Sequence, residues 1–220
     1  MADDRPRPFI FTLLRHGESV GNAESRWQGQ SEFPLTENGR SQARAVAKRW
    51  LAEQIRFDLI ITSPLMRAKE TAEIIGAALD VPVESDPVWL ERNVGQLAGL
   101  TAAEQRERFQ KPPFINPFES MSDDGEGDWE LFLRAGQGLH NLLKRSAGSY
   151  LVVSHGGILN LTMHAVVGIA PQANFSGVRF QFGNTGFARL IYSPLQHRWA
   201  IDTLNDRAHW PEAVDEVTVS

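Results

Sequence analysis

The chain alternates short apolar segments with longer segments of helical periodicity, and this alternation limits the possible folds more than any other feature. Each apolar segment is rich in β-branched or aromatic residues and has the length of a buried strand. These segments lie at Phe9–Leu14, Phe57–Thr62, Val81–Glu84 and Tyr150–Val153, and two or three hairpin strands are expected within 178–204. Strands that alternate with helices predict an α/β fold, here a three-layer α/β/α sandwich with a mostly parallel central sheet.

The intervening helices have recognisable start signals. Thr36 is expected to cap the helix that contains Trp50. Ser63 and Pro64 predict the start of the next helix, because they place a capping hydroxyl before a proline at the first helical position. A later helical stripe consists of Phe132, Gly136, Leu139 and Leu143, and the last helix is expected at about 156–167.

The regular pattern weakens between residues 101 and 128. Prolines within 111–117 exclude a regular helix there, and 122–128 is acidic and glycine-rich. This stretch does not fit a calcium-binding EF-hand loop, because Gly125 and Trp129 interrupt that pattern. A chain of 220 residues has the length of one domain, so we predict a single domain over 1–220 with a small cap insertion at about 101–128.

Composition excludes several classes of protein. The chain has no cysteine, which rules out disulfides, a thiolate nucleophile and a cysteine-based zinc site. Its formal net charge of −5 has the wrong sign for a protein that coats nucleic acid. The basic residues are mostly arginine, which binds phosphate or carboxylate through paired N–H donors.

No apolar segment resembles a secretion signal or a membrane span. The apolar stretch from Phe9 ends at Arg15, and polar side chains interrupt the stretch from Ile158 to Ala170. We therefore expect a soluble cytoplasmic protein that does not bind membranes. The sequence leaves the oligomeric state open, including a homodimer.

Charged side chains follow the predicted strands where helices begin. Arg15 and His16 follow the first strand, Arg67 lies in the helical turn after the second, Glu91 follows the third and His155 follows the fourth. Sites in open α/β sheets form at these strand ends, so the side chains are expected to meet. Arginines and helix N-termini bind phosphate, a neutral imidazole attacks phosphorus, and a carboxylate can protonate the leaving oxygen.

The motifs at these junctions resemble those of the histidine phosphatase superfamily, which includes the cofactor-dependent phosphoglycerate mutases. They are Leu14-Arg15-His16-Gly17-Glu18-Ser19, Ser63-Pro64-x-x-Arg67-Ala68-x-x-Thr71-Ala72, Glu91-x-x-x-Gly95-x-x-x-Gly99 and Val153-Ser154-His155-Gly156-Gly157. Smaller matches are Asn22, Gln28-Gly29, Pro34-Leu35-Thr36-Glu37-x-Gly39 and Asn184-Thr185-Gly186. The resemblance runs in order from about residue 10 to 187, which is most of the chain.

The resemblance implies a phosphoglycerate mutase-like fold and a role for each matching residue. His16 would be the nucleophile that forms a phosphohistidine, and Glu91 would donate and accept the proton. Arg15, Arg67 and His155 would hold the phosphoryl oxygens. Further contacts to the phosphate or the rest of the substrate are expected from Asn22, Gln28, Gly29, Arg92 and Gly156. Neither a metal ion nor another cofactor is implied, and the expected ligand is a small phosphorylated metabolite.

The sequence has features of two branches of the superfamily, the phosphatases and the mutases. Gly125-Glu126-Gly127 followed by Arg134 resembles the Gly-Glu-Ser…Arg segment of the phosphatase branch, with Gly127 in place of serine. The segment from Glu91 to Leu100 is closer to the mutases, although Ala98 stands where family members often have glutamate. The stretch 101–116 lacks the paired arginines and the longer insertion with which mutases hold bisphosphoglycerate. We favour a phosphatase, with a phosphoglycerate mutase as the alternative.

Other interpretations use fewer of these residues. Ser154, Asp202 and His209 follow the chain order of a serine hydrolase, but the first glycine of the nucleophile elbow is missing. A non-catalytic phosphate-binding module is the other rival, although such proteins usually lose the nucleophile or an arginine.

Structural roles are also open for individual residues. Arg67 could pair with Glu70 or Glu73 on its own helix, and Glu91 could pair with Arg92 or Arg67. We expect the remaining histidines to be structural or at the surface, most tryptophans to lie in the core, and Trp27 to be a possible exception that contacts substrate. The remaining histidines are His140, His164, His197 and His209.

Overall fold

The computed structural model describes residues 7–109, 113–120, 122 and 124–210. Within these residues, six strands form one sheet in the order β3-β2-β4-β1-β5-β6. The strands are β1 (Phe9–Arg15), β2 (Leu59–Thr62), β3 (Val83–Ser85), β4 (Ser149–Ser154), β5 (Phe187–Ser193) and β6 (Arg198–Asp206). The helices are α1 (Val20–Ala23), α2 (Glu37–Ala52), α3 (Met66–Leu79), α4 (Ala102–Arg108), α5 (Asp128–Leu143) and α6 (Gly156–Val167). Short 3₁₀ turns are η1 (Pro87–Trp89), η2 (Gly95–Leu97) and η3 (Ala173–Phe175).

The sheet is mostly parallel, as the alternation of elements predicted. β1, β2, β3 and β4 pair in parallel, whereas β5 pairs antiparallel with both β1 and β6. The register places Arg15 opposite Ser154 and Thr62 opposite Val153. The carboxyl ends of β1, β2 and β4 therefore lie together at one edge of the sheet.

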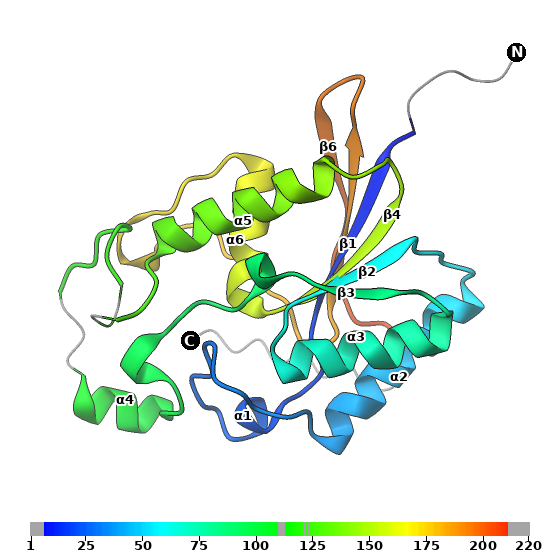
Figure 1. Cartoon of the computed structure of the whole chain (residues 1–220). Helices are drawn as coiled ribbons and strands as arrows, with labels where there is room; N and C mark the ends of the chain where they lie inside the picture. The colour runs from blue at the N-terminus through cyan, green and yellow to red at the C-terminus, as the bar shows by residue number, and fades with distance from the viewer. Residues whose placement is uncertain (1–6, 110–112, 121, 123, 211–220) are drawn as a thin grey trace, which may run out of the picture.

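Helices cover both faces of the sheet, which makes the three layers visible in Figure 1. Leu13 and Val152 belong to the core cluster that contains residues of α5 and α6. Their chain neighbours Leu14 and Val153 belong to the cluster that contains residues of α2 and α3. Successive side chains of a strand point to opposite faces, so the central strands are apolar along their whole length.

The predicted helix starts are confirmed in two cases and wrong in one. Thr36 caps α2 by accepting a hydrogen bond from the Gly39 amide at 3.0 Å, and α6 spans the predicted residues. However, α3 begins only at Met66, and its N-cap residue is Leu65. The Ser63 hydroxyl is instead within hydrogen-bond distance of the His155 ring, so the residue predicted as a helix cap belongs to the site.

Two predictions about the core also need correction. The buried face of α5 consists mainly of Leu131, Ala135, Leu139 and Leu142, whereas Phe132, Gly136 and Leu143 are only partly buried. Among the six tryptophans only Trp50 and Trp89 are buried in the core, and the others are partly exposed. The stripe was misplaced because α5 carries apolar side chains on more than one face, including the exposed Leu133.

The predicted cap region contains a helix, α4, that the sequence analysis did not predict. Thr101 and Glu104 form a capping box at the start of α4, with reciprocal side-chain to backbone hydrogen bonds. This Thr-x-x-Glu pattern is readable in the sequence, and it lies before the prolines. Residues 110–112, 121 and 123, which belong to the same predicted cap, lie outside the described residues.

No helix in the described part of the chain combines the length and the apolar character that crossing a bilayer requires.

Two glycine-to-alanine substitutions should change stability in opposite directions. A methyl group on Gly39 would collide with the backbone of Glu18, just after the first strand, whereas a methyl group on Gly136 in α5 meets open space. Gly39→Ala should destabilise the fold by about 1–3 kcal/mol through overpacking. Gly136→Ala should stabilise it by about 0.5–1 kcal/mol, because alanine restricts the unfolded helix segment.

Urea unfolding of the two variants and the unchanged protein measures both values. Equal effects of the two substitutions would contradict the close contact between α2 and the Glu18 backbone.

Candidate active site

The carboxyl edge of the sheet brings the two predicted histidines into contact. The ring centroids of His16 and His155 lie 5.0 Å apart, with an angle of 60° between the ring planes. The parallel register of β1 and β4 produces this contact, because each histidine follows directly after paired residues of its strand. The His16 amide also donates to the Ser154 carbonyl at 2.9 Å, which fixes the separation of the two strand ends.

His16 is held as a neutral imidazole. His16 is only 2% exposed, and its Nδ1 is 2.7 Å from the Gly17 carbonyl oxygen. Burial, followed by the charges of Arg67 and Arg15, lowers the pKa of His16 well below its ordinary value. Since a carbonyl can only accept, Nδ1 carries the proton, and the lone pair of the neutral ring is on Nε2. This is the form in which an imidazole acts as a nucleophile.

His155 has a similar environment but a different partner. Its Nε2 lies 2.8 Å from the Ser63 hydroxyl, and its buried Nδ1 has no hydrogen-bond partner among the described residues. Burial and the positive charges around it, Arg67 first, lower the pKa of this ring well below the ordinary value. The ring is therefore fixed at one nitrogen and available at the other.

Two buried guanidinium groups flank the histidines. Arg15 donates to the Phe182 carbonyl at 2.8 Å, and Arg67 donates to the carbonyls of Ser31 and Gly29 at 2.8 and 2.7 Å. Burial lowers the pKa of Arg67 to about 10, so the group is still a cation at neutral pH. Neither arginine forms an ion pair within the described residues, and the Nε of each has no hydrogen-bond partner there.

Unpaired buried cations are costly, so their presence at one place indicates a site for an anion. Glu70 and Glu73, the helix partners that Arg67 might have had, contact Arg40 and Lys69 instead. The arrangement therefore favours anion binding over a structural role for Arg67.

Glu91 approaches the same place from a segment without regular secondary structure. Its carboxylate accepts hydrogen bonds from the amides of Gly157 and Ile158 at 3.0 and 3.1 Å, at the N-terminus of α6. It also accepts from the Arg92 amide at 2.8 Å. Its negative charge opposes the lowering of the pKa values of Arg15 and Arg67, which places it near both guanidinium groups. Glu91 is thus held at a helix dipole and forms no ion pair with Arg67 or Arg92 in the described chain.

The remaining predicted contact residues are distributed unevenly. The Asn22 side chain accepts from Asn184, Gln28 accepts from Ser19 at 2.7 Å, and the Gly29 carbonyl binds Arg67. Gly156 lies close to Arg15, since a Cβ there would be 3.8 Å from Nε. The Arg92 guanidinium differs, because it pairs with Asp128 and lies over the Phe175 ring at 5.6 Å. The Arg92 guanidinium therefore contacts Asp128 and Phe175 and none of the other predicted site residues.

The sequence analysis assigned no role to the residues that bind the backbone of Arg15 and His16. The amide of Thr185 donates to the Arg15 carbonyl at 2.9 Å, and the Asn184 side chain donates to the His16 carbonyl at 3.1 Å. The Thr185 hydroxyl is in turn bonded to the rings of His209 and Trp210, each at 2.9 Å. Asn184-Thr185-Gly186 was recognised as a motif, but the supporting role of His209 has no local sequence signal.

The serine hydrolase alternative is not favoured by the geometry. The Ser154 hydroxyl donates to the Trp89 carbonyl at 2.7 Å, Asp202 lies 3.6 Å from Arg189, and His209 is bonded to Thr185. Each of the three side chains has a separate partner, so the described structure contains no triad. A search of the described residues also gives no group of three or more histidine and acidic side chains placed to hold a metal ion.

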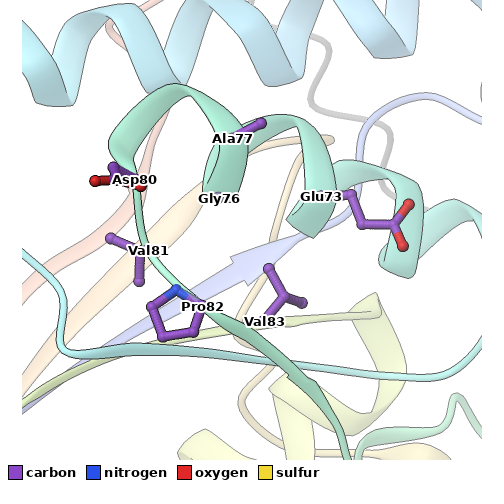
Figure 2. Close-up of a pocket in the computed structure, with 7 residues that line it drawn as sticks. All are labelled: Glu73, Gly76, Ala77, Asp80, Val81, Pro82 and Val83. Atoms are coloured by element: carbon purple, nitrogen blue, oxygen red, sulfur yellow. The ribbon is translucent and has the colours of Figure 1, made fainter.

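A surface hollow lies between α3 and β3. It is lined by Glu73, Gly76, Ala77, Asp80, Val81, Pro82 and Val83, and Figure 2 shows that the Glu73 side chain points away from the apolar lining residues. The polar side chains do not converge there. At about 1.5 Å per helical residue, Gly76 lies roughly 14 Å along α3 from Arg67, so the hollow is separate from the buried arginine and carries no site.

The comparisons with known proteins agree with this geometry. The sequence model of the histidine phosphatase superfamily (branch 1) matches residues 11–207, which is most of the chain. The chain therefore belongs to the histidine phosphatase superfamily. It is an enzyme of that superfamily, and the names of its relatives include both mutases and phosphatases.

Individual relatives fall into both groups. The chain is 38% identical over 216 residues to a probable phosphoglycerate mutase, GpmB, of Yersinia enterocolitica, covering 93% of this chain and 97% of the relative. Among solved structures, YhfR of Bacillus stearothermophilus superposes with a TM-score of 0.79 at 27% identity, over 91% of this chain and 98% of the other. A mycobacterial glucosyl-3-phosphoglycerate phosphatase superposes with a TM-score of 0.74 at 26% identity, over 90% and 99%. These neighbours share the phosphoglycerate mutase-like fold.

The burial of His209 predicts a pH-dependent contribution to stability. Burial, followed by the charge of Arg49, lowers the pKa of His209 to about 4 from its ordinary 6.5. Between these values the unfolded chain binds a proton that the folded chain excludes. The contribution of the neutral ring to stability is therefore complete above pH 6.5 and is lost as the pH falls toward 4. His209→Gln should reduce the slope of unfolding free energy against pH in this window by at most about 1.4 kcal/mol per pH unit, with partial exposure reducing the value.

Urea unfolding at several pH values between 4 and 7 measures this slope. His197→Gln is the matched control, because that ring is exposed on the turn between β5 and β6. An identical slope in His209→Gln and the unchanged protein would contradict a neutral, partly buried His209.

Proposed function

We propose that the protein is a metal-independent phosphatase that hydrolyses a small phosphomonoester through a phosphohistidine on His16. The observation that carries the proposal is the neutral His16 ring, buried between His155 and two guanidinium groups that lack an ion-pair partner in the described chain. A phosphoryl group is the ligand that best matches this combination, since it offers several anionic oxygens around an electrophilic phosphorus.

In the first step, Nε2 of His16 forms a bond to phosphorus as the ester P–O bond breaks. Protonated Glu91 gives its proton to the leaving oxygen, which departs as an alcohol. Arg15, Arg67 and the free Nδ1 of His155 hold the phosphoryl oxygens through this step. Because His16 is neutral before the attack, no proton has to leave its Nε2 first.

In the second step, water attacks the phosphorus of the phosphohistidine. The Glu91 carboxylate takes a proton from the water as the new P–O bond forms and the P–N bond breaks. The products are inorganic phosphate and a neutral His16, with Glu91 protonated for the next cycle.

Two observations support a phosphatase over a mutase. Glu126 and Arg134 belong to the segment that resembles the phosphatase branch. They form a bidentate ion pair, and Arg134 also donates to the Glu91 carbonyl. In the cap, Arg106 and Arg108 are exposed on α4 and are not adjacent in sequence, unlike the paired arginines expected of a mutase. The similarity to a solved phosphatase is consistent with this choice, whereas the GpmB relatives carry a mutase name.

Removal of the His16 ring should abolish the covalent intermediate. With a ³²P-labelled phosphomonoester, the unchanged protein should yield a labelled species that alkaline quench preserves and acid quench destroys. His16→Ala should yield none, because the nucleophilic nitrogen is missing. Denaturing gel autoradiography after the two quenches measures the label.

The fate of the label separates the two activities. A phosphatase passes the labelled phosphoryl group to water, whereas a phosphoglycerate mutase returns it to a hydroxyl of phosphoglycerate. Label that persists in His16→Ala would place the nucleophile elsewhere, and transfer to phosphoglycerate faster than release of inorganic phosphate would overturn the phosphatase assignment.

Replacement of Glu91 should affect poor leaving groups most. A poor leaving group needs a proton from the acid, so Glu91→Gln should lower kcat on alkyl phosphates by about 10²- to 10⁴-fold. The leaving group of nitrophenyl phosphate is a stabilised nitrophenolate that needs no proton. The rate of phosphoenzyme formation from this substrate should therefore fall far less. Rapid-quench kinetics with both substrates measures the difference, and equal losses would show that Glu91 is not the acid.

A further inference from the structure

Glu91 lies in a segment that cannot position it without outside support. Residues 90–94 connect η1 to η2 and belong to no helix or strand. His16 and His155, in contrast, follow directly after paired strands of the sheet. A proton donor has to be held within hydrogen-bond distance of the leaving oxygen, so the support of this segment matters for the chemistry.

Arg134 of α5 provides this support with every donor that its side chain has. Its Nη1 donates to the carbonyls of Val88 and Leu90 at 3.0 and 2.6 Å, and its Nη2 donates to the Glu91 carbonyl at 3.1 Å. Its Nε and Nη2 also bind the two oxygens of the Glu126 carboxylate at 2.8 and 2.7 Å. A guanidinium group has five N–H donors, and these contacts use all five.

Glu126 holds the same segment from its other end. One of its carboxylate oxygens accepts from the Asn93 amide at 3.2 Å, and its own amide donates to the Asn93 carbonyl at 2.7 Å. Arg134 and Glu126 therefore bind the backbone on both sides of Glu91. Neither residue has a described contact with the Glu91 carboxylate, which is bound at the N-terminus of α6.

The helix that carries Arg134 is a rigid base. Its neighbours Leu131 and Ala135 on α5 are fully buried in the core cluster with residues of α6. α5 and α6 pack side by side on one face of the sheet, as Figure 1 shows. Arg134 thus connects the Glu91 backbone to the same helix layer that presents the carboxylate-binding amides of α6.

We propose that Arg134, together with Glu126, is a positioning residue that sets the Glu91 carboxyl group for proton transfer to the leaving oxygen. The inference rests on the proposed function of Glu91 and adds the residues through which the fold controls it. A positioning role depends on the fork geometry of the guanidinium group and not only on its charge. Lysine keeps the charge and cannot bind four acceptor groups, so Arg134→Lys separates the two effects.

The test compares leaving groups in Arg134→Lys and Arg134→Gln. Both variants should lower the rate of phosphoenzyme formation from alkyl phosphates by about 10- to 100-fold, because a misplaced acid protonates the leaving oxygen poorly. Both should keep the rate of phosphoenzyme formation from nitrophenyl phosphate within about 3-fold, because phosphate binding is intact and a nitrophenolate needs no proton from Glu91. The matched control is Arg145→Gln, which removes another arginine–glutamate pair, with Glu84, beyond the other end of α5. The control should leave both rates within about 2-fold, as expected for an exposed pair.

A double variant with Glu91→Gln completes the test. If Arg134 acts through Glu91, Glu91→Gln combined with Arg134→Lys should be no slower on alkyl phosphates than Glu91→Gln alone. Equal losses on both substrates in the Arg134 variants, or additive losses in the double variant, would overturn the positioning role.

The outcomes for Glu91 and Arg134 are distinguishable. If Glu91→Gln slows poor leaving groups selectively and Arg134→Lys does not, only the inference about Arg134 is overturned. If Glu91→Gln shows no such selectivity, both the proposed acid and the inference about Arg134 are overturned. Circular dichroism and thermal unfolding check that the variants fold. If the Arg134 variants do not fold, Glu126→Gln replaces them, and it should show the same selectivity with a smaller loss.

Discussion

Burial of two guanidinium groups and two imidazole rings at one edge of the sheet is the constraint on which the rest of the site depends. Arg15 and Arg67 have no ion-pair partner within the described chain, and carbonyl oxygens accept their hydrogen bonds. Carbonyls fix the direction of the donors without neutralising the charge. Burial, together with the resulting positive potential, keeps His16 and His155 neutral, and the place between them is suited to an anion.

The apolar layers on both sides of the sheet make this arrangement tolerable. Buried cations and rings that cannot be protonated reduce stability, so a large core has to offset them. Phe11, Leu13 and Leu14 of β1 are fully buried directly before Arg15, and they divide between the two core clusters. Arg15 therefore follows a strand whose side chains are buried in both core clusters.

The proposed nucleophile and the proposed acid are supported in different ways. His16 follows a central strand, and the Thr185 amide binds the backbone next to it. Glu91 does not directly follow a strand. Side-chain hydrogen bonds from Arg134 and Glu126 hold its backbone segment, whereas pairing of strands in the sheet holds the backbone of His16.

The sequence by itself determined the layered α/β fold and the strand ends at which the site forms, because apolar periodicity and junction residues are local signals. Thr36 and the helix after His155 were predictable for that reason. Only the tertiary structure decided that Ser63 serves His155 instead of capping α3, that Arg92 pairs with Asp128, and that Arg134 binds the Glu91 backbone. These contacts join residues 36 to 92 positions apart. No local pattern specifies which donor reaches which acceptor at such separations, since packing of the helices onto the sheet sets those distances.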